Sequence, residues 1–190
     1  MNTSAFSRLT CRRLLMAASL LAYAGAARAQ TDQAGLVKNF EARVSSYMQL
    51  EKSQSSPHKS TDSPAKLADQ HQQAAAKMRA ARPAAKQGDI FTADIAAYFR
   101  RQIASTLNGP DGAKVKASLR HAEPLKKISL RVNQRYPQSI PLQSTPPTLL
   151  LNLPRLPKEL QYRIVGDDLV LYDSHSDLVV DFIENALPGS

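Results

Sequence analysis

The sequence Asp173–Asp177, DSHSD, contains the three residue types of a serine hydrolase within five positions. Such catalysis needs a carboxylate that orients a histidine, which in turn contacts a serine hydroxyl. Five consecutive residues do not normally fold back into that geometry, so a polar β-turn is the favoured interpretation. No G-x-S-x-G motif occurs elsewhere in the chain. The sequence therefore predicts no catalytic residue, and His175, Asp173 and Asp181 are only weak candidates for acid–base chemistry.

Asp181 differs from most acids of the C-terminal region because it lies inside a predicted strand, between Val180 and Phe182. A buried carboxylate needs a compensating partner, and Arg163 is the expected one. Most of the other acids fall in predicted turns, where short carboxylate side chains are structurally favoured.

Metal and cofactor motifs are missing from the sequence. The histidines show no H-E-x-x-H spacing, and no glycine-rich phosphate loop or dinucleotide fingerprint occurs. His175 with Asp173 and Asp177 could weakly bind a divalent cation, but an ordinary turn is favoured. We therefore predict no metal and no cofactor.

The N-terminus has the three parts of a secretory signal peptide. Arg8, Arg12 and Arg13 precede an apolar run over residues 14–27, which is too short to span a bilayer and ends in the small residues around Ala29. We expect cleavage after Ala29 and a periplasmic location. The Arg12-Arg13 pair leaves both the general secretion route and the twin-arginine route open.

The cysteine content and the charge distribution of the exported chain limit its chemistry and its partners. The only cysteine, Cys11, leaves with the signal peptide, so disulfides and thiol chemistry are excluded.

Residues 30–158 carry 20 Lys+Arg and 9 Asp+Glu (net +11), whereas residues 159–190 carry one Arg and 7 acids (net −6). The basic part could contact an anionic envelope component or an envelope protein. Nucleic acid is not expected, since the chain has no tryptophan, lacks interleaved aromatics and faces the wrong compartment.

Helical spacing dominates the chain up to residue 123. An apolar stripe beginning at Leu36 and Phe40 predicts a first helix, and Ser63-Pro64 is a typical start for a second helix, which Pro83 should end. Between them, residues 53–63 read as a flexible linker. Thr92 should cap a third helix with Ile95 and Phe99 on its buried face, followed by a short helix around Val115.

Strand patterns follow from residue 128 onward. The alternation around Leu130 predicts a strand that could join the C-terminal sheet, and six prolines between Pro137 and Pro157 predict an extended segment whose leucines pack on the helices. From Glu159 onward, alternation and turn residues predict a three-stranded antiparallel meander with hairpins at Gly166-Asp167 and at residues 173–177. In the last strand, Leu178, Val180 and Phe182 are expected on one face, and Val179, Asp181 and Ile183 on the other.

Three sequence stretches carry a resemblance to a known family. LPRLPKELQYRIVGDDLVLYDSHSDLVVDFIENALP, with GDIFTADIAAYFR and VNQRYPQSIPL upstream, resembles a family of exported bacterial proteins without a characterised function. The resemblance extends from about Gly88 to Pro188 and is most specific in the C-terminal motif. It implies a location in the cell envelope and assigns no catalytic residue.

These observations predict an α+β protein in which N-terminal amphipathic helices pack on a small, mostly antiparallel C-terminal sheet. The expected function is that of a non-enzymatic periplasmic interaction or accessory protein. The alternatives are a hydrolase of an envelope polymer or ester, and a binding module for an anionic lipid or polysaccharide. The expected division is a signal peptide (1–29), a helical region (30–123), a strand with the Pro/Leu-rich segment (124–158), and the meander (159–190).

Overall fold

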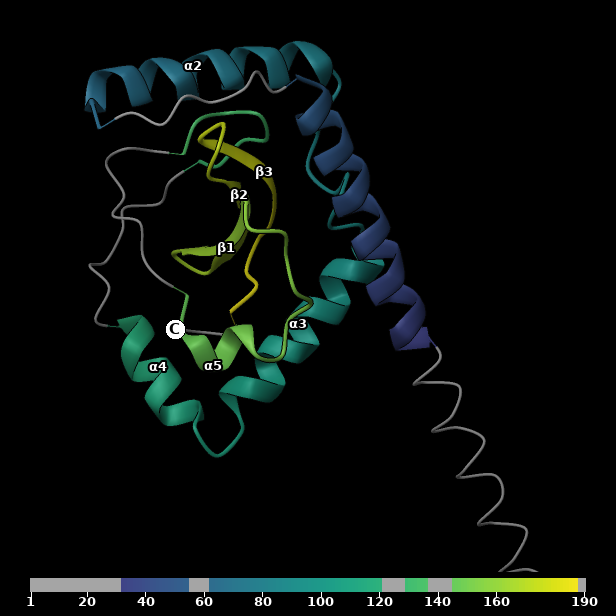
Figure 1. Cartoon of the computed structure of the whole chain (residues 1–190). Helices are drawn as coiled ribbons and strands as arrows, with labels where there is room; N and C mark the ends of the chain where they lie inside the picture. Colours follow the sequence, from purple (N-terminus) through teal and green to yellow (C-terminus); the bar gives the residue numbers. More distant parts are fainter. Residues whose placement is uncertain (1–31, 55–61, 121–128, 137–144, 188–190) are drawn as a thin grey trace, which may run out of the picture. The chain divides into compact units, whose positions relative to one another are not determined.

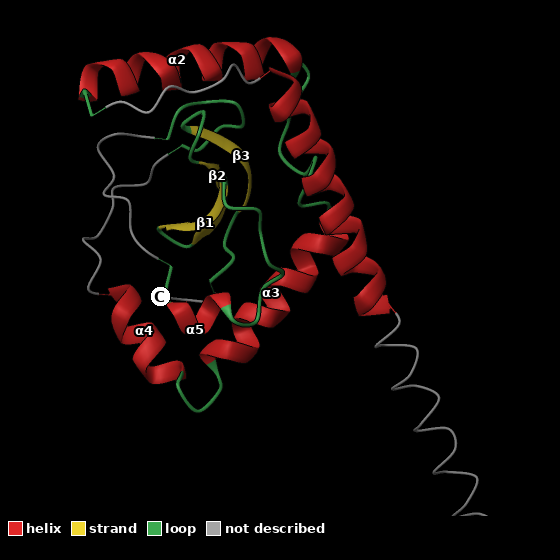
Figure 2. Ribbon diagram, viewed as in Figure 1, coloured by secondary structure: helices red, strands yellow, loops and turns green. Residues whose placement is uncertain are grey.

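The structure is a computed structural model that describes residues 32–54, 62–120, 129–136 and 145–187. The chain divides into two compact units, Met1–Lys38 and Asn39–Ser190. A first helix covers residues 32–54. The named elements that follow are α2 (Pro64–Ala81), α3 (Ala93–Leu107), α4 (Gly112–Arg120), α5 (Pro147–Leu150), β1 (Leu160–Val165), β2 (Asp168–Asp173) and β3 (Leu178–Ile183) (Figure 1). Helices packed with a C-terminal antiparallel sheet confirm the predicted α+β class (Figure 2).

The meander forms where the alternation predicts it. The strands lie in the order β1-β2-β3, and Val165 pairs with Asp168 beside the first hairpin turn. Gly166 in that turn has φ +59°, a left-handed conformation that glycine adopts without a side-chain clash. β2 is buried at five of its six positions, as expected for the central strand of a sheet that is covered on both faces.

β3 departs from strict alternation through a β-bulge. Leu171 lies opposite Asp181, but the next residue, Tyr172, lies opposite Val179, so Val180 is an extra residue. The predicted division of β3 into two alternating faces is therefore wrong. Since partners in register share a face, one face of the sheet carries Leu169, Leu171 and Asp173 with Ile183, Asp181 and Leu178, and the other carries Val170 and Tyr172 with Phe182 and Val179.

An aromatic cluster from the helical part covers the face that carries Leu171. Phe99 of α3 is fully buried, with its ring centroid 5.0 Å from Phe40 of the first helix and 5.9 Å from Tyr162 of β1. Phe91, which precedes α3, completes the cluster at 5.1 Å from Phe99. The apolar stripes predicted for the first and third helices thus meet on this face of the sheet.

The opposite face is covered by residues 129–136. The predicted fourth strand does not form in the described part of that stretch, which makes only one isolated bridge, from Arg135 to Leu178. The reason is local, because Asn133 has φ +62° and turns the chain away from an extended course. The segment still follows the edge of β3, where the Asn133 N–H donates to the Val179 carbonyl at 2.9 Å. The buried cluster on this face comprises Leu130, Tyr136, Val165, Val170, Tyr172, Val179 and Phe182.

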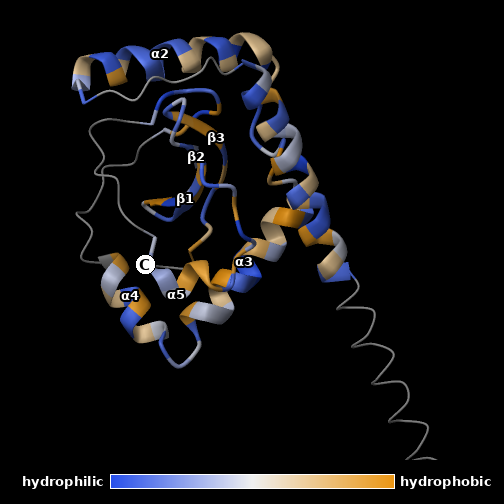
Figure 3. Cartoon of the chain, in the orientation of Figure 1, coloured by the Kyte–Doolittle hydropathy of each residue, from blue (hydrophilic) through white to orange (hydrophobic). Residues whose placement is uncertain are grey.

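α2 begins and ends where proline and its neighbours predict. Pro64 is its first residue and Ala81 its last, two positions before Pro83. Figure 3 shows α2 as a helix in which hydrophilic and moderately hydrophobic residues are mixed, and only Ala75 and Met78 are buried in it. Of the linker predicted near residues 53–63, residues 53 and 54 belong to the first helix, and 55–61 lie outside the described residues.

The Pro/Leu-rich segment is only partly extended. Its described part, from residue 145 onward, includes the single helical turn α5, which has Pro147 at its first position. Proline supports this start because its fixed φ suits the first turn and its missing N–H has no helical partner there. Leu149 and Leu153 are buried, whereas Leu150 and Leu151 are exposed. The prediction that the leucines pack on the protein therefore holds for only some of them.

Candidate functional site

The turn between β2 and β3 encloses the carboxylate of Asp173. This side chain is fully buried, and its Oδ2 accepts hydrogen bonds from the Tyr47 hydroxyl at 2.6 Å and the Ser176 hydroxyl at 2.7 Å. Its Oδ1 accepts from the backbone N–H groups of His175 at 2.8 Å and Ser176 at 3.2 Å. Burial, the nearby Asp173 charge and the hydrogen bond to it raise the pKa of Tyr47, so this phenol stays protonated and donates. Four donors to one buried carboxylate are typical of a structural anchor.

The His175 ring faces the first helix instead of the acids of its own turn. Its Nδ1 contacts the carboxylate of Glu51, which is itself buried. Asp177, considered above as a possible third ligand, pairs with Arg135 at 2.8 Å and accepts from the Tyr172 hydroxyl at 3.0 Å. Asp173 and Asp177 thus bond to groups other than the His175 ring. The cavity that the His175–Glu51 pair lines has a volume of only about 10 Å³, close to the size of one water molecule.

Asp181 accepts backbone hydrogen bonds and does not pair with Arg163 as predicted. Its carboxylate accepts four N–H groups, from Gly88 (3.0 Å), Ile90, Phe91 and Phe182 (2.8 Å each). Arg163 lies in register with Val170 and Phe182, on the opposite face of the sheet, so the predicted pair cannot form. Three of the four donors lie just before α3, and successive backbone N–H groups of this kind form a nest for an anion. Asp181 thus fixes β3 to the start of α3.

Burial and hydrogen bonding act on Asp181 in opposite directions. Complete burial raises the pKa of this carboxyl above its usual range, and the four N–H donors offset only part of that rise. The folded chain therefore takes up a proton at a pH where the unfolded chain is still ionised. We expect the contribution of this group to stability to be fully present below the ordinary aspartate pKa and to be lost as the pH rises through the raised value.

The pH prediction is measured as the free energy of unfolding of the wild type minus that of Asp181→Asn, obtained by urea denaturation at a series of pH values. Asparagine does not titrate, so the difference should fall as the pH rises. A difference that grows with pH would show that the N–H donors dominate and that the pKa is lowered.

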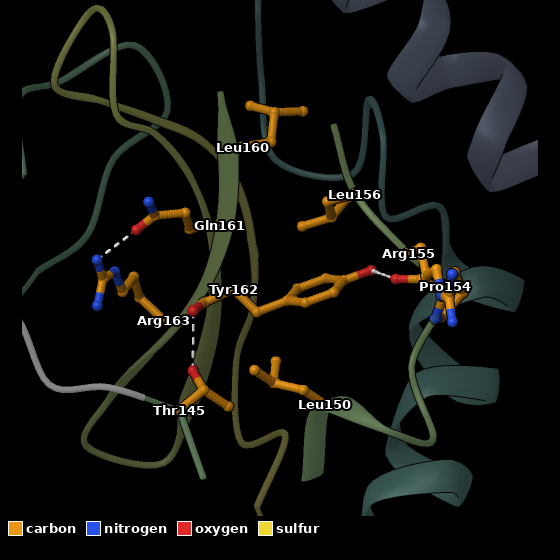
Figure 4. Close-up of a pocket in the computed structure, with 9 residues that line it drawn as sticks. All are labelled: Thr145, Leu150, Pro154, Arg155, Leu156, Leu160, Gln161, Tyr162 and Arg163. Atoms are coloured by element: carbon orange, nitrogen blue, oxygen red, sulfur yellow. Dashed lines mark hydrogen bonds between the residues drawn. The ribbon is translucent and has the colours of Figure 1, made fainter. Parts of the chain in front are cut away.

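A cavity lined by described residues lies along the edge of β1. It has a volume of about 460 Å³, within the range typical of ligand pockets. In Figure 4 the Tyr162 ring extends between Leu150 and Leu156, while Gln161 and Arg163 lie on the other side of the strand. The complete lining is Thr145, Leu150, Pro154, Arg155, Leu156, Leu160, Gln161, Tyr162 and Arg163.

The pocket wall is held in place by hydrogen bonds to β1. The Tyr162 hydroxyl donates to the Pro154 carbonyl at 2.9 Å, and the Thr145 hydroxyl donates to the Tyr162 carbonyl at 2.8 Å. The Leu160 N–H donates to the Pro157 carbonyl at 3.0 Å. Burial raises the pKa of Tyr162, so its hydroxyl remains a donor. Two backbone groups of β1 are therefore already engaged, which disfavours pairing of a further strand along this edge.

Two arginines give the pocket a positive charge. The Arg163 guanidinium lies 5.9 Å from the Tyr172 ring centroid, which fixes it on the far side of β1. Arg155 is exposed, and within the described residues it makes no hydrogen bond or ion pair. A pocket with leucine and tyrosine walls and an accessible guanidinium can hold an apolar group that carries an anion.

Sequence reasoning missed Glu51 and the pocket. Glu51 was detectable, because it lies four residues after Tyr47 on the buried stripe of the first helix, where an ionisable residue needs a partner. The pocket had a weaker signal. The run of leucines and prolines indicated buried contacts, but it did not indicate which leucines would leave a space between them.

No cluster of side chains that could bind a metal ion occurs in the part of the chain that the structure describes. Within that part, no helix is long and apolar enough to cross a membrane. Comparisons with protein-family models, curated proteins and solved structures gave no match to this chain, so the resemblance drawn from its motifs stays a prediction.

Proposed function

We propose that the chain is an exported, non-enzymatic binding protein of the bacterial cell envelope, and that the β1-edge pocket is its ligand site. The observation that carries this proposal is the coincidence of a 460 Å³ cavity with leucine and tyrosine walls and an exposed arginine, Arg155, at its lining. The ligand class that fits is a small amphiphile with an apolar chain and one anionic group.

Export is supported by the sequence alone. A basic stretch, a short apolar run and the small residues around Ala29 form the pattern of a cleaved signal peptide. The absence of cysteine after Cys11 leaves nothing for an oxidising compartment to cross-link. The pocket also suits an envelope location, where amphiphiles with phosphate or carboxylate groups are abundant.

The hydrolase alternative has less support. Asp173 and Asp181 are buried and each accept four hydrogen bonds, which leaves little capacity for them to exchange protons with a substrate. The cavity beside His175 is about 10 Å³ and is too small for an ester or a sugar.

The proposal predicts that the protein binds octanoate more tightly than 1-octanol, which has the same number of carbon atoms and no charge. Replacing Arg155 by glutamine should weaken octanoate binding by about 1.5–3 kcal/mol, the usual value of a charge-assisted hydrogen bond, and leave 1-octanol binding unchanged. Leu156→Trp should weaken binding of both compounds, because the larger side chain occupies part of the cavity beside the Tyr162 ring. Isothermal titration calorimetry measures each case.

Two variants on α2 serve as controls. Lys66→Gln removes an exposed positive charge far from the pocket lining, and Leu67→Ser removes a half-exposed leucine. Both should bind octanoate as the wild type does. The proposal fails if the wild type binds neither compound, or if Leu156→Trp leaves octanoate binding intact.

A further inference from the structure

The turn around α5 exposes two adjacent leucines. Leu151 is 83% exposed and Leu150 is 39% exposed. The only other large hydrophobic side chain of comparable exposure in the described residues is Leu67, which stands alone on α2 at 43%. Single exposed leucines are ordinary, but a pair at the end of a one-turn helix exposes apolar area that a binding partner could cover.

The stretch of sequence that contains this turn is positively charged. Residues 145–163 contain Arg155, Lys158 and Arg163 against the single acid Glu159, a net charge of +2. Residues 164–190 contain six acids and no lysine or arginine, a net charge of −6. The lysine and arginine residues of this C-terminal part thus lie within nine residues of one another, and two of them, Arg155 and Lys158, are exposed and follow the exposed leucines closely in sequence, which complements a surface that is both apolar and anionic.

The exposed turn and the pocket share residues. Leu150 belongs to the exposed pair and also lines the cavity, and Arg155 lines the cavity while remaining exposed. Any surface that covers Leu150 and Leu151 therefore meets one wall of the pocket and its accessible cation. The exposed leucines and this wall of the pocket thus belong to one stretch of the chain, residues 150–156.

We propose that residues 150–158 dock the protein onto an anionic lipid bilayer, with Leu150 and Leu151 inserted among the acyl chains and Arg155 and Lys158 against lipid phosphates. The size of the patch favours a bilayer over a protein partner. A stable protein interface buries about 800 Å² on each side, whereas a few apolar side chains and cations suffice for reversible attachment to an anionic membrane. A docked protein would take its pocket ligand from the bilayer, and this further step rests on the proposed function.

The test uses protein purified from the periplasmic fraction of cells that express the full chain. It is sedimented with vesicles of phosphatidylcholine and phosphatidylglycerol in equal parts, and with vesicles of phosphatidylcholine alone. We expect binding to the mixed vesicles that weakens at high salt. Leu151→Ser should weaken it about tenfold through the lost burial of one leucine, and Arg155→Gln about fivefold through one lost charge near the surface.

Leu67→Ser and Lys66→Gln, which make the same chemical changes on α2, should bind vesicles as the wild type does. Because Leu151 does not line the cavity, Leu151→Ser should still bind octanoate normally. The docking proposal is overturned if the wild type does not bind the mixed vesicles, or if the α2 variants lose as much binding as the α5 variants. Vesicle binding without octanoate binding would support the docking proposal and count against the proposed ligand site. Octanoate binding without vesicle binding would support the ligand site and overturn the docking proposal, and the exposed leucines would then be a surface for a protein partner.

Discussion

Replacing Asp181 by alanine should lower the free energy of unfolding by about 3–5 kcal/mol, because several buried hydrogen-bond donors lose their acceptor at once. The change leaves three N–H groups before α3, those of Gly88, Ile90 and Phe91, without the acceptor that holds them. Each buried donor left unsatisfied costs about 1–3 kcal/mol, and water that enters the space offsets only part of the loss. Urea denaturation followed by circular dichroism measures the effect.

Two further variants separate the hydrogen bonds from the negative charge. Asp181→Asn keeps one oxygen acceptor but turns an NH₂ group toward N–H donors, so it should lose almost as much stability as Asp181→Ala. Glu184→Ala, at an exposed position just after β3, should change stability by less than about 0.5 kcal/mol. An Asp181→Ala protein as stable as the wild type would show that the N–H groups before α3 find other acceptors.

Much of the fold was predictable because it depends on local periodicity. The meander, the start of α2 at Pro64 and the buried face of α3 follow from alternation, from the preference of proline for the first helical turn and from helical spacing, and all three are confirmed. In each case the residues that determine the element are neighbours in sequence. Tertiary packing then reinforces what the local pattern already favours.

The placement of Asp181 was not predictable because it depends on one extra residue. Strict alternation puts Asp181 with Val179, whereas the bulge at Val180 moves it to the face carrying Leu171. No residue of β3 favours a bulge, since Leu178–Ile183 contains neither glycine nor proline. The N–H groups that bind the carboxylate lie about 90 residues earlier in the chain, and a sequence does not show which backbone donors a fold will bring together.

The failure of the predicted fourth strand has a similar cause. The alternation around Leu130 correctly indicated one buried side, since Leu130 and Tyr136 pack on the sheet. Asn133, in a left-handed conformation, then turns the chain and leaves one bridge in place of a ladder. Asparagine tolerates that conformation better than most residues, so the turn was compatible with the sequence, but the alternation on either side of it was the stronger signal.

The candidate site was the least predictable part of the molecule. Composition indicated that the leucines between Leu149 and Leu156 would be buried, yet two of them are exposed and two line a cavity. The deciding contacts are hydrogen bonds from Tyr162 to Pro154 and from Thr145 to Tyr162, which fix the segment beside β1 with a cavity between them. These depend on side-chain reach between a strand and an irregular segment, for which a sequence has no periodic signature.

Asp173 is the second position at which a single change should have a large effect. Asp173→Ala removes the acceptor of the Tyr47 and Ser176 hydroxyls and of two backbone N–H groups, and the carboxylate that it removes is fully buried. We expect a loss of about 3–5 kcal/mol in the free energy of unfolding, because several donors lose a common acceptor; urea denaturation measures it. Tyr47→Phe keeps the ring and deletes one charge-assisted hydrogen bond, so it should cost about 1.5–3 kcal/mol.

A double-mutant cycle tests whether the two residues act together. Once Asp173 is alanine, the Tyr47 hydroxyl has lost this acceptor, so Tyr47→Phe in that background should be neutral or stabilising. The coupling energy should therefore equal or exceed the cost of Tyr47→Phe alone. Asp111→Ala, which removes an exposed partner of Lys114, is the surface control and should cost less than about 1 kcal/mol. If the two losses simply add, the Tyr47–Asp173 contact does not fix the first helix to the turn, and the stability of that junction comes from the aromatic packing around Phe40 and Phe99.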